Sequence, residues 1–231
     1  MSDFICFAHR GASGHAPENT LSAIQKALDM GACWIEVDVF LADNELVVIH
    51  DSRLERTTDG VGDVTQQKIS YLRALNAGNG EKIPFLKEVL DIAAGKAGVN
   101  IELKGADTAA PVAALVGSYV SQKRFDYDHL IVSSFHHALL AEVKRCDSKI
   151  LIGVLLEKMC GDEVRAAERM GAYSIHISQK RVDEAFVMEA HRLGMRVFVY
   201  TVNRADEVRQ MKKLGVDGVF TNYPEICMGD G

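Results

Sequence analysis

Short apolar segments alternate with longer amphipathic segments along nearly the whole chain, and this alternation limits the folds that the chain can adopt. Apolar runs of this length are typical of buried strands, and the amphipathic stretches between them are typical of helices. Repeated strand–helix units predict a parallel sheet, because a helix is the usual connection between parallel strands. The predicted strands are residues 4–9, 34–40, 46–50, 99–104, 129–135, 149–156, 173–178, 196–202 and 217–222.

Helices are predicted between most of these strands, and several of them end on a glycine, which is a common helix stop before the next strand. When 34–40 and 46–50 are counted as one strand with a hairpin extension, the units number eight, as in a closed (β/α)8 TIM barrel. An open doubly wound α/β sheet is the alternative that periodicity alone leaves open. The predicted helices are residues 20–30, 86–94, 108–123, 137–146, 161–170, 183–193 and 205–214.

One polar, glycine-containing stretch at about 52–83 interrupts the alternation. We interpret it as a small loop-rich insertion above the barrel rather than as a second domain. The 231 residues are enough for one large hydrophobic core. The sequence therefore predicts a single barrel domain over 1–231.

Composition excludes some classes of function. A net charge of −6 and a pI near 5.8 do not fit a protein that binds nucleic acid through a basic surface. The opening MSDFICFAHRG has no basic region followed by a long apolar one, and no window resembles a membrane span. Five cysteines without a CxxC pair, mostly within apolar stretches, indicate reduced and buried thiols. We expect a cytoplasmic protein without stable membrane anchoring.

Charged side chains collect where the predicted strands end. The carboxyl ends of parallel barrel strands meet at one rim, and active sites of such barrels lie there. Side chains two apart on a strand face the same side, so they can enter one cavity together. The residues are His9 and Arg10, Glu36 and Asp38, His50 and Asp51, and Glu102 and Lys104.

These residue types together indicate phosphodiester chemistry. Three buried carboxylates, Glu36, Asp38 and Glu102, would repel each other unless a cation lay between them, and oxygen ligands suit Mg²⁺, Ca²⁺ or Mn²⁺. An arginine and a lysine can bind a phosphate, and two histidines can exchange protons near neutral pH. Each motif alone has an ordinary structural explanation: EVD can be a half-exposed edge strand, His50 a hydrogen-bonded structural residue, and ELK a surface pair. Their coincidence at successive strand ends favours a site.

The same motifs identify a family. The chain resembles the glycerophosphodiester phosphodiesterases, which are relatives of phosphatidylinositol-specific phospholipase C, and the resemblance covers essentially the whole chain in order. The motifs are HRGASGHAPENT (9–20), WIEVDVFLADNELVVIHD (34–51), LERTTDGVGDV (54–64), NIELK (100–104), SSF (133–135), TVN (201–203) and DGVFTNYP (217–224).

The resemblance implies a distorted (β/α)8 barrel with an insertion after the strand that carries the second histidine. It also implies metal-dependent hydrolysis of glycerophosphodiesters to glycerol 3-phosphate and an alcohol, in lipid and glycerol metabolism. Glu18 and Asn19 are expected to brace the loop after the first strand. The implied roles are acid–base catalysis for His9 and His50, metal binding for Glu36, Asp38 and Glu102, and substrate binding for Arg10, Lys104, Phe135 and Tyr200.

Two positions depart from the family pattern. Tyr200 stands where the family often has tryptophan, and Asn222 stands where it often has aspartate. The preferred alcohol therefore stays open, whereas neither departure touches the two histidines or the metal ligands. The native metal, the acid or base role of each histidine, a homodimer and the role of His176 and Ser178 also stay open. The alternative functions are a catalytically silent phosphodiester-binding barrel, a lysophospholipase D, and a metal-dependent sugar or aldol enzyme.

Overall fold

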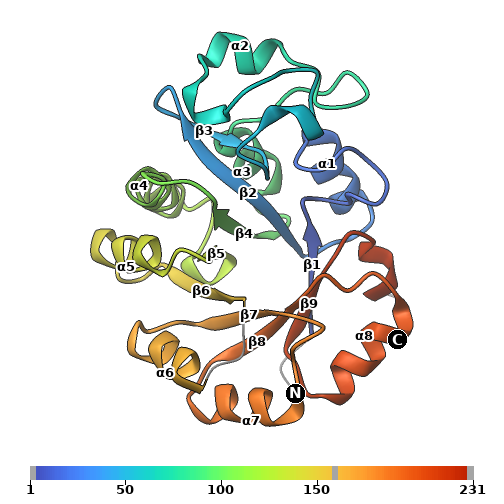
Figure 1. The fold of residues 1–231 in the computed structure, drawn as a ribbon, viewed down its shortest axis with the longest axis vertical. Helices are drawn as coiled ribbons and strands as arrows, with labels where there is room; N and C mark the ends of the chain where they lie inside the picture. Colours follow the sequence, from blue (N-terminus) through green and yellow to red (C-terminus); the bar gives the residue numbers. More distant parts are fainter. Residues whose placement is uncertain (1–3, 158–160, 228–231) are drawn as a thin grey trace.

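The computed structural model describes residues 4–157 and 161–227, and within them eight parallel strands close into a barrel (Figure 1). The strand order is β1-β9-β8-β7-β6-β5-β4-β2, and pairing of β1 with β2 closes the ring. The predicted (β/α)8 barrel is confirmed, and the open sheet is wrong. The barrel strands are β1 (Ile5–His9), β2 (Trp34–Ala42), β4 (Gly98–Leu103), β5 (Leu130–Ser134), β6 (Leu151–Leu156), β7 (Ser174–Ser178), β8 (Arg196–Tyr200) and β9 (Gly218–Thr221).

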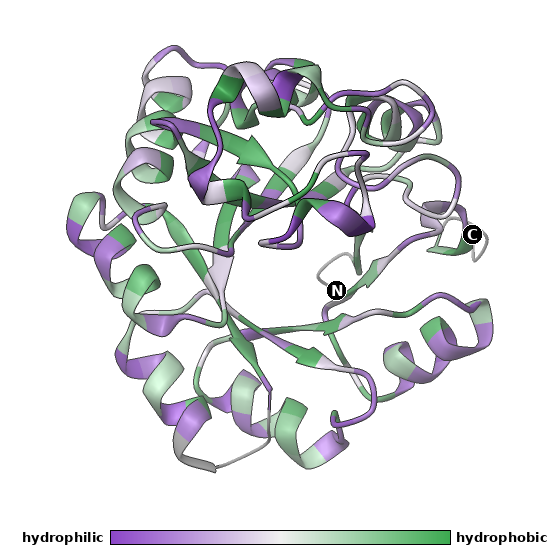
Figure 2. Ribbon diagram, turned by 45° about the horizontal axis from the view of Figure 1, so that its top comes forward, coloured by the Kyte–Doolittle hydropathy of each residue, from purple (hydrophilic) through white to green (hydrophobic). Residues whose placement is uncertain are grey.

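Helices surround the barrel and turn their apolar faces to the strands, as the colouring of Figure 2 shows. This packing forms the largest core, because the outward side chains of every strand meet a helix. Within the described residues no helix is long and apolar enough to cross a bilayer. The helices are α1 (Leu21–Asp29), α3 (Leu86–Ala93), α4 (Ala109–Ser121), α5 (His137–Cys146), α6 (Gly161–Arg169), α7 (Glu184–Arg192) and α8 (Ala205–Lys213).

The inside of the barrel is filled by a separate apolar cluster. Phe7, Phe198 and Phe220 are buried there, and the ring centroid of Phe7 lies 4.5 Å from that of Phe220 and 4.9 Å from that of Phe198. Two residues further along the chain the same faces of these segments carry His9, Tyr200 and Asn222. The aromatic cluster is therefore the floor on which the polar rim rests.

The insertion has a small core of its own. β3 (Glu45–Val48), which runs antiparallel to the end of β2, leads into the insertion, which itself contains η1 (Leu54–Arg56), η2 (Val64–Gln66) and α2 (Ile69–Ala74). Figure 1 shows this segment at the top of the view, beside β3 and the end of β2 that projects from the barrel. The stretch is loop-rich as predicted, although the short helix α2 was not foreseen. The small core combines buried side chains of the insertion with others from β2, β3 and the residue after β3: Phe40, Ala42, Val47, Ile49, Leu54, Val64, Leu72, Leu75, Ala77 and Ile83.

The predicted burial of the cysteines is wrong. Cys33 and Cys146 are exposed, and Cys6 and Cys227 are partly exposed; all four are free thiols. Cys33 lies at a bend just before β2, and Cys146 is the last residue of α5, so both side chains reach solvent. Cys160 lies outside the described residues.

Two glycines give a matched test of barrel packing. A Cβ on Gly218 would lie 2.3 Å from the backbone oxygen of Ile5, where β9 pairs with β1, whereas a Cβ on Gly117 in α4 would meet open space. Gly218→Ala should lower the free energy of unfolding by roughly 1–3 kcal/mol because neither strand can move aside. Gly117→Ala should raise it by about 0.5–1 kcal/mol, as expected inside a helix. Urea unfolding measures both, and equal effects would contradict the close packing of β1 and β9.

Candidate active site

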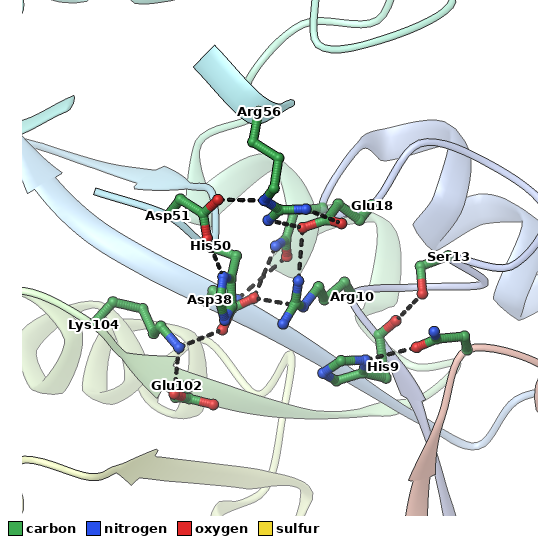
Figure 3. Close-up of polar contacts among 12 residues, drawn as sticks. His9, Arg10, Ser13, Glu18, Asp38, His50, Asp51, Arg56, Glu102 and Lys104 are labelled. Atoms are coloured by element: carbon green, nitrogen blue, oxygen red, sulfur yellow. Dashed lines mark hydrogen bonds and ion pairs between the residues drawn. The ribbon is translucent and has the colours of Figure 1, made fainter. Parts of the chain in front are cut away.

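The structure brings the predicted polar residues together at the carboxyl ends of the first strands. Figure 3 shows the side chains of most of them, though not Glu36, converging from β1, β2, β4 and the segment after β3. Because Glu36 is the register partner of His9, and Asp38 that of Glu102, neighbouring strands place these side chains side by side. The residues that meet are His9, Arg10, Glu36, Asp38, His50, Glu102 and Lys104.

The three carboxylates form a tight acidic cluster. One oxygen from each of Glu36, Asp38 and Glu102 lies within 4.8 Å of the others. Glu36 and Asp38 are 2% and 1% exposed, and Glu36 Oε1 has no hydrogen-bond partner among the described residues. Burial, together with the charges of Asp38 and Glu102, raises the pKa of Glu36, and burial beside Asp38 raises that of Glu102 to about 7. The charge of Arg10 offsets only part of this effect at Glu36.

Two cations compensate the other side of the cluster. Lys104 Nζ lies 2.7 Å from Glu102 Oε1 and 3.5 Å from Asp38 Oδ1, and Arg10 Nε lies 3.3 Å from Asp38 Oδ2. Burial alone would raise the pKa of Asp38, but Lys104 and Arg10 outweigh it and lower the pKa. Asp38 is thus the carboxylate that stays ionised, and it fixes both basic side chains at the rim.

The acidic cluster fits a hard divalent cation. Carboxylate oxygens are the preferred ligands of Mg²⁺ and Ca²⁺, and the unpartnered buried Oε1 of Glu36 is an acceptor that such an ion would satisfy. A second acidic group, Asp126, Asp128 and His129, is exposed and lies before β5, at the opposite end of the barrel. Its exposure does not call for an ion, since solvent already screens its charges.

His9 lies deep in the rim beside an amide. Its Nδ1 is 2.7 Å from Asn222 Oδ1, and its Nε2 is 4.0 Å from Glu36 Oε2. With the proton on Nδ1, the ring donates to Asn222 and turns Nε2 towards the acidic cluster. Burial and the neighbouring Arg10 lower the pKa of His9 to about 4. His9 is therefore neutral at physiological pH.

His50 has a carboxylate partner. Its Nδ1 lies 2.5 Å from Asp51 Oδ1, and Asp51 is in turn hydrogen-bonded by Arg56 of the insertion. The hydrogen bond from Arg56 lowers the pKa of Asp51 to about 2, so this carboxylate is charged. Burial lowers the pKa of His50 itself. Sequence reasoning placed Asp51 at the rim without a role and did not single out Arg56, although both lie in the motifs that carried the resemblance.

The turn after β1 holds Arg10 in place. Arg10 has a φ of +57° and donates its backbone N–H to Glu36 Oε2 at 2.9 Å. Arg10 Nη1 donates to Glu18 Oε1 at 2.8 Å, and Asn19 Nδ2 donates to Asp38 Oδ2 at 2.9 Å. Gly11 follows at a φ of +78°, where a Cβ would lie 2.6 Å from the backbone of Ala23. Glu18 and Asn19 thus brace the loop, as the sequence predicted.

The remaining predicted residues lie on the other side of the rim. The rings of Phe135 and Tyr200 meet edge to face at 6.1 Å, and Tyr200 Oη donates to Leu156 O at 3.0 Å. His176 is 1% exposed, is hydrogen-bonded to Ser174 Oγ at 2.9 Å and packs against Phe220. Burial lowers the pKa of His176 to about 3. His176 is thus part of the barrel interior beneath the rim.

Comparisons with known proteins agree on one family. Residues 9–226 match the model of the glycerophosphoryl diester phosphodiesterase family. A glycerophosphodiester phosphodiesterase of Caldanaerobacter subterraneus is 36% identical over 97% of this chain and 96% of its own. A putative glycerophosphodiester phosphodiesterase of Bacillus subtilis is 34% identical over 97% of this chain and 96% of its own.

Solved structures of similar proteins superimpose on nearly the whole chain. An Oleispira antarctica phosphodiesterase, solved in complex with the product sn-glycerol-3-phosphate, superimposes with a TM-score of 0.88 at 30% identity, over 97% of this chain and 95% of its own. A glycerophosphodiester phosphodiesterase of Agrobacterium tumefaciens gives 0.81 at 28% identity, over 98% of both chains.

If the acidic cluster binds a cation, Glu36→Gln should weaken Mg²⁺ binding without lowering the stability of the cation-free protein. Glu36→Gln removes a buried like charge, so without a cation the free energy of unfolding should stay equal or rise. Binding of Mg²⁺ should weaken at least roughly tenfold, which removes about 1.4 kcal/mol of the stabilisation that saturating Mg²⁺ adds. Thermal unfolding with and without Mg²⁺ measures both effects.

Asp128→Asn, in the exposed acidic group, is the matched control and should leave the response to Mg²⁺ unchanged. An equal response to Mg²⁺ in wild type and Glu36→Gln would contradict the assignment of Glu36 to a cation site.

Proposed function

The chain belongs to the glycerophosphoryl diester phosphodiesterase family and is a phosphodiesterase of this kind, and from this premise we propose a metal-dependent reaction catalysed by two histidines. The substrate is a small glycerophosphodiester, and the products are glycerol 3-phosphate and an alcohol. The observation that carries the proposal is a buried acidic cluster with two basic side chains and two histidines around it at one barrel rim.

Glu36, Asp38 and Glu102 would hold the divalent cation, which is Mg²⁺, Ca²⁺ or Mn²⁺. When bound, the cation supplies positive charge to the phosphate oxygens and stabilises the charge that develops there. Its binding also relieves the repulsion that raises the pKa values of Glu36 and Glu102. Binding of a cation would therefore favour the ionised forms of Glu36 and Glu102.

Arg10 and Lys104 bind the phosphate in this proposal. Both are already anchored to Asp38, so their charges are placed before substrate arrives. Arg10 turns Nη1 to Glu18 and Nε to Asp38, and among the described residues this leaves Nη2 able to donate to a phosphate oxygen. Preorganised donors of this kind stabilise a transition state without further reorganisation.

His9 and His50 transfer the protons. One accepts the proton of the attacking oxygen as the new P–O bond forms, and the other donates a proton to the alcohol oxygen as its P–O bond breaks. Glycerol carries a 2-hydroxyl beside its phosphorylated carbon, and an attacking group within the substrate has a much higher effective concentration than water. We assign the attack to this hydroxyl, which gives a cyclic phosphate that water then opens.

Phe135 and Tyr200 line the side from which the alcohol leaves. Their rings provide an apolar wall without a charged group, which suits several alcohols rather than one. The cytoplasmic location stays a prediction from the sequence. Whether the protein forms a homodimer stays open.

Turnover of glycerophosphocholine tests the function. His9→Ala and His50→Ala should each lower turnover by at least ~10²-fold, the usual scale for losing a positioned acid or base. Both variants should unfold at nearly the wild-type temperature, since neither ring is part of the apolar core. A chelator should abolish wild-type activity, and Mg²⁺, Mn²⁺ or Ca²⁺ should restore it.

Wild-type turnover in both histidine variants would remove them from the mechanism. Full activity in excess chelator, with no metal left in the protein, would rule out the cation. Binding of glycerophosphocholine without any turnover would instead identify a catalytically silent barrel.

A glycerophosphodiester analogue without the 2-hydroxyl tests the route of attack. It should bind through the same phosphate contacts but turn over slower by several orders of magnitude, roughly the loss expected when an intramolecular nucleophile is removed. Steady-state kinetics with both substrates measure the difference. Equal turnover numbers would show that water attacks directly.

A further inference from the structure

Six side chains form a continuous line of ionic contacts over the barrel rim, and we call it the rim network. It links Asp38, Arg10, Glu18, Arg56, Asp51 and His50 in that order (Figure 3). Its two ends are a carboxylate of the acidic cluster and a histidine of the proposed acid–base pair. Of its members only Arg56 lies in the insertion, in η1 (Leu54–Arg56).

Arg56 bridges two carboxylates that each hold a residue of the site. Its Nη1 and Nη2 donate to Glu18 Oε2 and Oε1 at 2.9 and 2.8 Å, and its Nε donates to Asp51 Oδ2. The other contacts of Glu18 and Asp51 are to Arg10 Nη1 at 2.8 Å and to His50 Nδ1 at 2.5 Å. The planar guanidinium donates two hydrogen bonds to Glu18 and a third to Asp51, a geometry that a lysine ammonium cannot reproduce.

The ionisation of both carboxylates agrees with this arrangement. Burial alone would raise the pKa of Glu18, but the hydrogen bonds from Arg56 and the charge of Arg10 outweigh it and lower the pKa. The hydrogen bond from Arg56 also lowers the pKa of Asp51. Both groups are therefore acceptors at physiological pH, and each can hold a basic partner in one orientation.

We propose that Arg56 is a positioning residue through which the insertion orients the catalytic groups: it holds Asp51 against Nδ1 of His50, and Glu18 against Arg10. His50 is thereby kept with Nε2 directed away from Asp51 and available to the substrate, and Arg10 is kept directed at the phosphate position. The inference rests on the proposed function, because it assigns Arg56 a role in the reaction that His50 and Arg10 perform.

A purely structural role for Arg56 makes a different prediction. Its side chain is 47% exposed, and exposed ion pairs contribute little to folding stability. Loss of Arg56 should therefore change activity far more than stability. A structural salt bridge would do the reverse, or would change neither.

Arg53 offers a matched control in the same segment. Its side chain is 65% exposed and, among the described residues, its side-chain hydrogen bonds go to neighbouring Glu55. Arg53→Ala removes the same charge from the insertion without touching the rim network. Arg56→Lys keeps the positive charge of Arg56 but not the planar guanidinium that donates hydrogen bonds to both carboxylates.

Kinetics give the first readout, with glycerophosphocholine as substrate and Mg²⁺ saturating. Arg56→Ala should lower kcat by about 10- to 100-fold, the usual scale when a residue that orients a directly acting site residue is removed. Arg56→Lys should recover only part of the loss, added guanidinium should restore part of the activity of Arg56→Ala, and Arg53→Ala should keep the wild-type kcat. The thermal unfolding temperatures of all variants should agree closely.

Nuclear magnetic resonance of the histidine side chains gives a second readout that needs no substrate. The Nδ1 proton of His50, identified by its absence in His50→Gln, should shift in Arg56→Ala and in Asp51→Asn but not in Arg53→Ala. A wild-type kcat and an unmoved resonance in Arg56→Ala would overturn the inference. So would a fall in activity matched by a fall in unfolding temperature with the resonance unmoved.

The two proposals fail in different ways. If the wild-type enzyme does not turn over glycerophosphocholine but the His50 resonance moves as expected, the proposed substrate is wrong and the positioning by Arg56 stands. If the wild-type enzyme is active and Arg56→Ala behaves like Arg53→Ala, the proposed function stands and the positioning role is wrong.

Discussion

The crowding of three carboxylates at one buried rim is the constraint on which the rest of this structure depends. Like charges this close cannot all remain ionised in a low-dielectric site without compensation. Lys104 and Arg10 compensate Asp38, whereas Glu36 keeps an unpartnered oxygen and a raised pKa. The basic side chains that would bind a phosphate are therefore already in place, and the uncompensated part of the cluster is the part that a divalent cation would complete.

The barrel supports this arrangement, because several polar rim residues continue a strand whose preceding inward side chain belongs to the apolar floor. Phe7 precedes His9 by two residues, and Phe220 precedes Asn222 by two, so one alternation builds both the core and the site. The aromatic floor also closes the barrel from below. Substrate can then approach only from the carboxyl ends of the strands, where the insertion supplies Arg56.

Sequence could predict the barrel and most of the site because both are encoded locally. Strand–helix alternation and the two-residue spacing of Glu36 and Asp38 leave little freedom in where those side chains point. The contacts of Arg56 could not be predicted, because they depend on how a loop-rich insertion folds back over the rim. Cysteine burial was mispredicted for a related reason, since hydropathy does not show that the apolar stretch holding Cys33 begins at a turn.

The most direct test of this account is a crystal structure of the protein with Mg²⁺ and sn-glycerol 3-phosphate bound. The account predicts one Mg²⁺ held by Glu36, Asp38 and Glu102, a phosphate that contacts Arg10 and Lys104, and His9 and His50 with their Nε2 atoms near the reacting oxygens. A cation held elsewhere, with the phosphate bound away from the acidic cluster, would contradict it.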